Sequence, residues 1–202
     1  MENFVNSLPS KNNIKVTYES YKPVFSEIVT NVDNKLRKTL HLSSNPTYKS
    51  RVKSFNSYYR KVLRLKSEEA EKNNFVELTD MMGIRVICAF LEDLSEVEQQ
   101  IKDNFVVKDK KYRCELKSFR EFGYESVHVL VSIPKDCMPK KCDLPLPETL
   151  VCEIQIRTIL QDAWAEVEHE LIYKSEFTPF DMPLRRKLAS MNASLTLADI
   201  IF

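Results

Sequence analysis

The chain contains only two glycines, Gly83 and Gly123, among its 202 residues. At average usage a chain of this length would contain about 14. A phosphate-binding P-loop, a dinucleotide-binding fingerprint and a kinase glycine-rich loop each require several glycines within a short span, so the sequence excludes all three. Lysine and arginine side chains would therefore have to hold the phosphates of any bound nucleotide. We expect each glycine to occupy a position where a side chain is not tolerated.

The sequence also lacks paired cysteines and long apolar segments. Its five cysteines form no Cys-x-x-Cys pair, which argues against a cysteine metal site and fits reduced thiols in the cytosol. The most apolar window, 81–91, is interrupted by Arg85 and is too short to span a bilayer. Residues 1–13 have neither a basic start nor an apolar run. We therefore expect a cytoplasmic protein with no membrane partner.

No excess of charge of either sign is present. The net charge is +1, so the total charge predicts no nucleic-acid binding, and any basic surface must be local. The one basic stretch of this kind lies within residues 108–120. With 43% hydrophobic and 29% charged residues, the composition is typical of a soluble globular protein, and we expect one domain spanning residues 1–202.

Hydrophobic periodicity predicts four strands interleaved with helices. The predicted strands span residues 81–91, 105–108, 127–133 and 150–157. The predicted helices span residues 23–41, 50–73, 94–103, 158–174 and 183–202. Because some connections are of hairpin length, this pattern favours an α+β mixed sheet covered by helices over a doubly wound fold. The apolar stripes of the first and last helices would pack within the chain, on a second copy in a homo-oligomer, or on a protein partner.

The predicted strand 150–157 alternates strictly between apolar and polar residues. Glu153, Gln155 and Arg157 share one of its faces, and the helix that follows carries a cluster of functional groups, Asp162, Glu166, Glu168, His169 and Lys174. A strand that presents a carboxylate, an amide and a guanidinium before entering a helix is typical of a site on a rigid scaffold. The alternative is an edge strand whose polar face lies in solvent.

A second group of polar residues falls on the predicted helix 50–73. Lys53, Ser57 and Lys61 are four residues apart and share one helix face, and Arg51 lies near its start, where the helix dipole also favours an anion. The alternative is a solvated basic face. Asp80 stands at the head of the first apolar strand, where it either belongs to a site or ends a turn.

Five motifs, in this order and at these separations, resemble the synthetase domain of the RelA/SpoT family. They are Arg51-x-Lys53-x-x-x-Ser57-x-x-x-Lys61, Asp80-Met-Met-Gly83-Ile84-Arg85, Gly123-Tyr124-x-Ser126-x-His128, Glu153-Ile-Gln155-Ile-Arg157-Thr158 and Trp164-Ala165-x-x-x-Glu168-His169-x-x-x-Tyr173-Lys174. The resemblance covers a core of residues 48–174, and the flanking helices 23–41 and 183–202 are similar to those of small alarmone synthetases. It implies a nucleotidyltransferase-like mixed sheet of about five strands flanked by helices.

The resemblance also implies an activity, that of an ATP-dependent pyrophosphokinase. Such an enzyme transfers the β,γ-pyrophosphate of ATP to the 3'-hydroxyl of GTP or GDP and makes (p)ppGpp. Because no histidine of the chain is followed by aspartate, the His-Asp signature of the family's hydrolase domain is missing, and we expect synthesis without hydrolysis.

Carried over by position, the family's residue roles fall on three groups in this chain. The catalytic carboxylates, which would also bind Mg²⁺, are Asp80 and Glu153, and Glu153 could also accept the 3'-hydroxyl proton. The ATP-binding residues are Arg51, Lys53, Ser57, Lys61 and Arg85, of which the two arginines would stack on adenine. The acceptor-binding residues are Arg120, Tyr124, His128, Gln155 and Asp162.

The chain departs from the family pattern on its acceptor side. Phe122 precedes Gly123 where the family has a small polar residue, and Asp162 stands where small alarmone synthetases often have asparagine near guanine. The altered acceptor side resembles toxic members of toxin–antitoxin pairs, some of which modify the 3' end of tRNA. The tRNA contacts would then be Lys108, Lys110, Lys111, Arg113 and Lys117. Three alternatives stay open: a guanosine-nucleotide acceptor, a tRNA acceptor with an antitoxin partner, and a non-catalytic nucleotide- or RNA-binding module.

Overall fold

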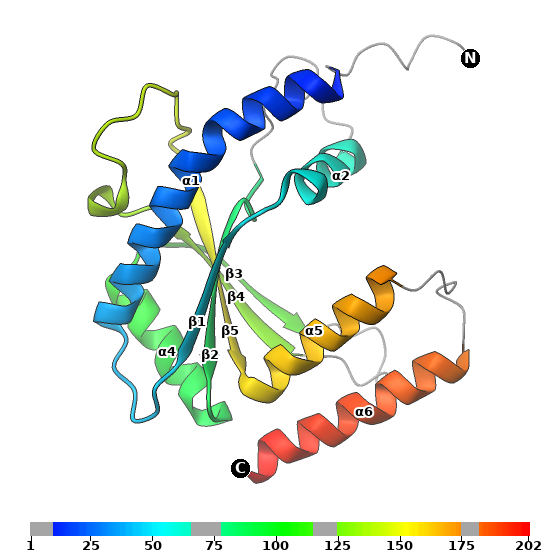
Figure 1. Cartoon of the computed structure of the whole chain (residues 1–202). Coiled ribbons are helices and arrows are strands. Elements are labelled where there is room, and N and C mark those ends of the chain that lie inside the picture. Colours follow the sequence, from blue (N-terminus) through cyan, green and yellow to red (C-terminus); the bar gives the residue numbers. More distant parts are fainter. Residues whose placement is uncertain (1–9, 66–77, 115–124, 175–181) are drawn as a thin grey trace.

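The computed structural model describes residues 10–65, 78–114, 125–174 and 182–202, and its centre is a five-stranded mixed sheet (Figure 1). The strands are β1 (Thr47–Val52), β2 (Met82–Cys88), β3 (Val107–Cys114), β4 (Glu125–Ser132) and β5 (Val151–Thr158). Their order across the sheet is β1-β2-β5-β4-β3, with β2 and β5 parallel and every other pair antiparallel. This confirms the α+β fold and the five strands that the family resemblance implied.

Helices cover both faces of the sheet. They are α1 (Lys11–Thr39), α2 (Phe55–Leu65), α4 (Leu91–Asn104), α5 (Ile159–Lys174) and α6 (Met182–Ile201), with a short 3₁₀ turn η1 (Lys135–Cys137). Helices α1 and α4 lie on one side of the sheet, and α5 and α6 lie on the other (Figure 1). The final helix packs against α5. None of the described helices combines the length and the hydrophobicity needed to cross a membrane.

The strand register shows that the two faces of the sheet carry different kinds of side chain. Directly paired residues point to the same side of a sheet, and Arg85 pairs with Lys49 on β1 and with Gln155 on β5. The residues between them point the other way: Ile84 and Ile154 are fully buried in the core that α1 and α4 complete. One face of the sheet is therefore core, and the other carries the polar side chains.

The edge-strand alternative for residues 150–157 is wrong. Strand β5 lies between β2 and β4, and Gln155 and Arg157 are each less than a tenth exposed despite their polarity. Burial of such groups is tolerated where they find polar partners: Gln155 donates to Glu153 on the same strand, and Arg157 forms an ion pair with Asp162 of α5 at 3.8 Å. The alternating pattern therefore marks a covered polar layer rather than a wet face.

The predicted helix 50–73 is also wrong in its first part. Residues Thr47–Val52 form strand β1, which pairs with β2, and α2 begins only at Phe55, after Ser54, whose Oγ accepts a hydrogen bond from the backbone N of Ser57. Residues 66–73 lie outside the described part. The first helix starts at Lys11, not at residue 23, and Pro23 lies inside it. Buried residues such as Ile14 and Tyr18 hold this earlier stretch on the core, so tertiary packing outweighs the local effect of proline.

The cysteines agree with the expectation of reduced thiols. Cys88, Cys137, Cys142 and Cys152 are free, and burial raises the pKa of Cys88 to about 12. Burial likewise raises the pKa of Cys152, which has no exposed surface. Thiols of this kind are packed inside the core and are not reactive.

Candidate active site

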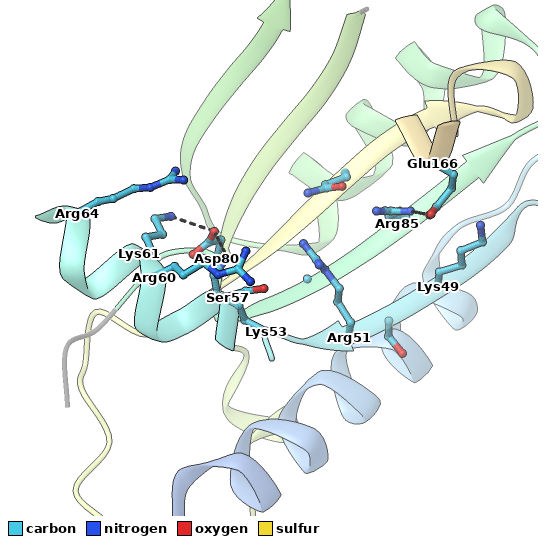
Figure 2. A pocket seen from close by; sticks show the side chains of 13 residues that line it. Lys49, Arg51, Lys53, Ser57, Arg60, Lys61, Arg64, Asp80, Arg85 and Glu166 are labelled. Atoms are coloured by element: carbon cyan, nitrogen blue, oxygen red, sulfur yellow. Dashed lines mark hydrogen bonds and ion pairs between the residues drawn. The ribbon is translucent and has the colours of Figure 1, made fainter. Parts of the chain in front are cut away.

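A cleft of about 660 Å³ opens on the polar face of the sheet, between β1, α2, β2, β5 and α5 (Figure 2). Its lining residues are Lys49, Ser50, Arg51, Lys53, Ser57, Arg60, Lys61, Arg64, Asp80, Gly83, Arg85, Gln155 and Glu166. Seven lysines and arginines face only two carboxylates there. A concave site with this excess of positive charge attracts a polyanion.

One end of the cleft is organised around Asp80. Its Oδ2 accepts hydrogen bonds from Lys53 Nζ at 2.7 Å and Lys61 Nζ at 2.9 Å, whereas its Oδ1 is buried and has no hydrogen-bond partner among the described residues. Burial alone would raise the pKa of Asp80, but the two lysines outweigh it and hold the pKa below its usual value. Tyr18 of α1 donates to the carbonyl oxygen of Lys53, which fixes this end of β1. We call this the Asp80 end of the cleft.

Glu153 is held by a chain of hydrogen bonds within the sheet. Its Oε1 lies 2.8 Å from His128 Nδ1 on β4, and its Oε2 accepts from Gln155 Nε2 at 2.8 Å. His128 Nε2 in turn lies 2.9 Å from Ser126 Oγ. Burial would raise the pKa of Glu153, but the hydrogen bonds from His128 and Gln155 lower it, so the group is ionised at neutral pH.

The structure brings the two predicted catalytic carboxylates near each other. Glu153 pairs in register with Gly83, which lies three residues after Asp80, and the charge of Asp80 acts on the pKa of Glu153. Among the described residues, no cluster of three or more histidine, cysteine, aspartate or glutamate side chains could hold a metal ion. Mg²⁺ needs no such cluster, because it commonly binds one or two carboxylates together with substrate phosphates. Two carboxylates, one with an unpaired buried oxygen, fit that requirement.

The opposite end of the cleft is organised around Arg85, and we call it the Arg85 end. The Nη1 of Arg85 donates to Asp162 Oδ1 at 3.2 Å and to Glu166, both on α5. Asp162 is only 4% exposed and also binds Lys49 Nζ at 2.6 Å. Arg51 lies on the same face of the sheet, opposite Gly83 in the register and between the two ends of the cleft (Figure 2).

Apart from Lys108 and Lys110, the sequence-predicted site residues fall into three groups. Those that line the cleft together are Arg51, Lys53, Ser57, Lys61, Asp80, Arg85 and Gln155. Glu153, His128 and Asp162 adjoin it through their bonds to one another or to lining residues. Arg120, Tyr124 and Lys117 lie outside the described residues, as do the side chains of Lys111 and Arg113. The acceptor roles of His128, Gln155 and Asp162 stay predictions.

Lys108 and Lys110 lie apart from the cleft. Both are on β3, which is the strand at the far edge of the sheet from β1. Lys110 pairs in register with the core residue Val129, and its Nζ contacts Glu98 of α4, on the face away from the cleft. The structure therefore does not join these two predicted tRNA contacts to the basic cleft.

Sequence reasoning missed three charged residues of the cleft, Lys49, Arg60 and Arg64, and named Glu166 only as one of the polar groups on the helix 158–174, without a role. For Lys49 a signal exists, because Lys49, Arg51 and Lys53 alternate with the period of a strand. Arg60 and Arg64 are four residues apart, like Ser57 and Lys61, and so extend the basic face of α2. Nothing local distinguishes Glu166 from the other acidic residues of α5.

The expectation that a side chain is not tolerated at glycine is wrong for Gly83. A Cβ there would lie 3.9 Å from the carbonyl oxygen of Glu153 and 4.0 Å from Arg51, which are ordinary contacts. Because Gly83 lines the cleft, a larger side chain would instead fill part of the cleft. Gly123 lies outside the described residues.

Comparison with known proteins supports the relationship that these motifs indicated. Residues 50–178 match the family model described as a region found in RelA / SpoT proteins. The chain belongs to the RelA/SpoT family. It is 33% identical over 126 residues to the GTP pyrophosphokinase YwaC and 35% identical over 121 residues to the GTP pyrophosphokinase YjbM, both from Bacillus subtilis. The matched regions are 62% and 58% of this chain but 57% and 53% of those proteins. The chain thus spans little more than half the length of these curated RelA/SpoT relatives.

Solved structures confirm the RelA/SpoT synthetase fold. The small alarmone synthetase 2 of Bacillus subtilis superposes with a TM-score of 0.65 at 27% identity, covering 87% of this chain and 91% of that one. The small alarmone synthetase 1 of the same organism superposes with a TM-score of 0.71 at 23% identity, covering 91% and 92%. Structures of the latter protein have been solved with its product pppGpp and with AMPCPP.

Proposed function

We propose that this RelA/SpoT protein is an ATP-dependent pyrophosphokinase that transfers the β,γ-pyrophosphate of ATP to the 3'-hydroxyl of GTP or GDP. The observation that carries the proposal is the division of the cleft into two ends. Four cations, Lys53, Arg60, Lys61 and Arg64, gather with Asp80 at one end, and the guanidinium groups of Arg51 and Arg85 lie toward the other (Figure 2). A nucleoside triphosphate has the matching polarity, with phosphates at one end and an aromatic base at the other.

The phosphates of ATP would lie at the Asp80 end. Lys53 and Lys61 now neutralise Asp80, and their ammonium groups could turn to phosphate oxygens when ATP enters. Ser57 lies in the first turn of α2, where the helix dipole adds positive potential. At the other end, Arg51 and Arg85 offer guanidinium planes to the adenine ring, as stacking requires.

Bond formation needs the acceptor 3'-oxygen in line with the β-phosphorus of ATP. The new bond joins that oxygen to the β-phosphorus, the bond between the β-phosphorus and the α,β-bridging oxygen breaks, and AMP leaves. Glu153 is ionised and could accept the 3'-hydroxyl proton, while His128 and Gln155 keep its carboxylate in one orientation. Positioning of two reactants in this way can contribute about 7–11 kcal/mol.

Asp80 and Glu153 are the residues that would hold Mg²⁺. When bound, Mg²⁺ would neutralise charge on the phosphoryl oxygens during transfer. The unpaired Oδ1 of Asp80 is the atom that supports this role.

Incubation of the purified protein with [γ-³²P]ATP and a set of acceptors tests the proposal. We expect label in a guanosine nucleotide carrying a 3'-diphosphate when GTP or GDP is supplied, together with release of AMP. Label in tRNA would instead assign the acceptor to the tRNA alternative. Binding of ATP without transfer to any acceptor would support the non-catalytic module and contradict the proposal.

A further inference from the structure

Helix α5 contributes Glu166, a carboxylate without an assigned role, to the Arg85 end of the cleft. Its side chain is 53% exposed and lines the cleft, and its Oε1 accepts a hydrogen bond from Arg85 Nη1. Among the described residues, its second oxygen, Oε2, has no hydrogen-bond partner. Glu166 therefore presents an open acceptor to whatever binds there.

Arginine stacking leaves the identity of the base undetermined. A guanidinium plane can stack on any base, because every base has a π face. With the triphosphate at the Asp80 end, the base of ATP lies at the opposite end of the cleft, beside Arg85 and Glu166 (Figure 2). Recognition of this base needs a group that reaches its edge, and Glu166 is in place to do so.

We propose that Glu166 reads the donor base, with Oε2 accepting a hydrogen bond from the 6-amino group of adenine. This inference rests on the proposed function. A carboxylate only accepts hydrogen bonds, and the 6-amino group is the sole N–H donor on the edge of adenine in ATP. Hydrogen bonds to a charged group are stronger than neutral ones, so a base without the amino group binds more weakly.

Holding Arg85 in place is the competing role for Glu166. Asp162 binds the same Nη1 atom at 3.2 Å and is itself anchored by Lys49. Arg85 therefore keeps a second carboxylate partner when Glu166 is removed. Because Asp162 can position Arg85 without Glu166, the positioning of Arg85 does not account for the open oxygen of Glu166.

Calorimetric binding of two donors to three variants separates these roles. The donors are a non-hydrolysable ATP analogue and the matching purine riboside 5'-triphosphate analogue, which lacks only the 6-amino group. The variants are Glu166→Ala, Glu166→Gln, which can still accept from Arg85 through its amide oxygen, and Glu170→Ala as a control. Glu170 lies one turn further along α5 and is not among the residues that line the cleft.

For the wild type and Glu170→Ala, we expect the ATP analogue to bind about tenfold or more tightly than the analogue without the amino group. In both Glu166 variants this preference disappears. Equal weakening of both donors in Glu166→Ala, with the preference kept, would show that Glu166 only holds Arg85 and would overturn the inference while leaving the proposed function intact. Failure of the wild type to bind either donor would overturn both.

Discussion

Replacement of Asp80 by asparagine separates chemistry from folding at the Asp80 end of the cleft. The carboxylate pairs with Lys53 and Lys61, and the side chains of Lys53 and Asp80 are 11% and 22% exposed. Asparagine has the same shape and keeps one oxygen for a lysine, but the pair is largely buried, so we expect a stability loss of about 2 kcal/mol, more than for an exposed ion pair. For a chain of this size that corresponds to a fall in Tm of about 4–8 °C.

The effect of Asp80→Asn on catalysis should be far larger. Loss of the anionic ligand at the reacting phosphate costs several kcal/mol of transition-state stabilisation, which is about 10³-fold in rate. Binding of ATP without metal should persist, because the substitution removes a negative charge that faces the triphosphate. Circular dichroism melting, calorimetry and initial rates of label transfer measure the three quantities.

Asp136→Asn is the matched control for Asp80→Asn. Asp136 also pairs with a lysine, Lys35, at 2.8 Å, but it is 66% exposed and lies on η1, away from the cleft. The control should keep wild-type rates and stability. An Asp80→Asn protein that folds and retains more than about a tenth of the wild-type rate would refute the assignment of Asp80 as a catalytic group.

Three further substitutions test other parts of the structure. Gly83→Leu should raise KM for ATP by at least about tenfold with little change in Tm, because the side chain fills the cleft floor; an unchanged KM would contradict this. Tyr18→Phe removes the hydrogen bond to the Lys53 carbonyl and should cost about 1 kcal/mol in urea unfolding, whereas unaltered stability would show that the bond contributes nothing. Burial raises the pKa of Asp199, whose Oδ2 accepts a hydrogen bond from Thr158 Oγ1. Ionisation of Asp199 as pH rises through that pKa therefore destabilises the fold. Asp199→Asn should match the wild type below about pH 4 and melt at a higher temperature at pH 7; equal Tm values at both pH values would refute the shift.

The central strands were predictable because the pattern of apolar residues along each of them indicates which residues are buried. The apolar run around Ile84 and the alternation around Ile154 place core residues at known spacing, whatever the neighbours are. Strand β1 was not predictable in the same way. Its residues are mostly exposed, and only pairing with β2 makes them a strand, so the helical spacing from Lys53 onward was extended too far back.

In the candidate site, too, residues that follow a local pattern were predictable, whereas contacts between distant segments were not. Lys53, Ser57 and Lys61 were found from spacing along one segment, although the first of them lies before the helix and not on it. The contact of Lys49 with Asp162 joins residues 113 positions apart, and the one between Arg85 and Glu166 joins residues 81 apart. Such pairs follow from how α5 crosses the polar face, which one sequence does not reveal.

The most direct test of the account is a crystal structure of the protein with a non-hydrolysable ATP analogue and Mg²⁺. We expect the adenine between Arg51 and Arg85, the phosphates against Lys53 and Lys61, and the metal bound to Asp80 and Glu153. A nucleotide bound in the reverse direction, or outside this cleft, would contradict the account.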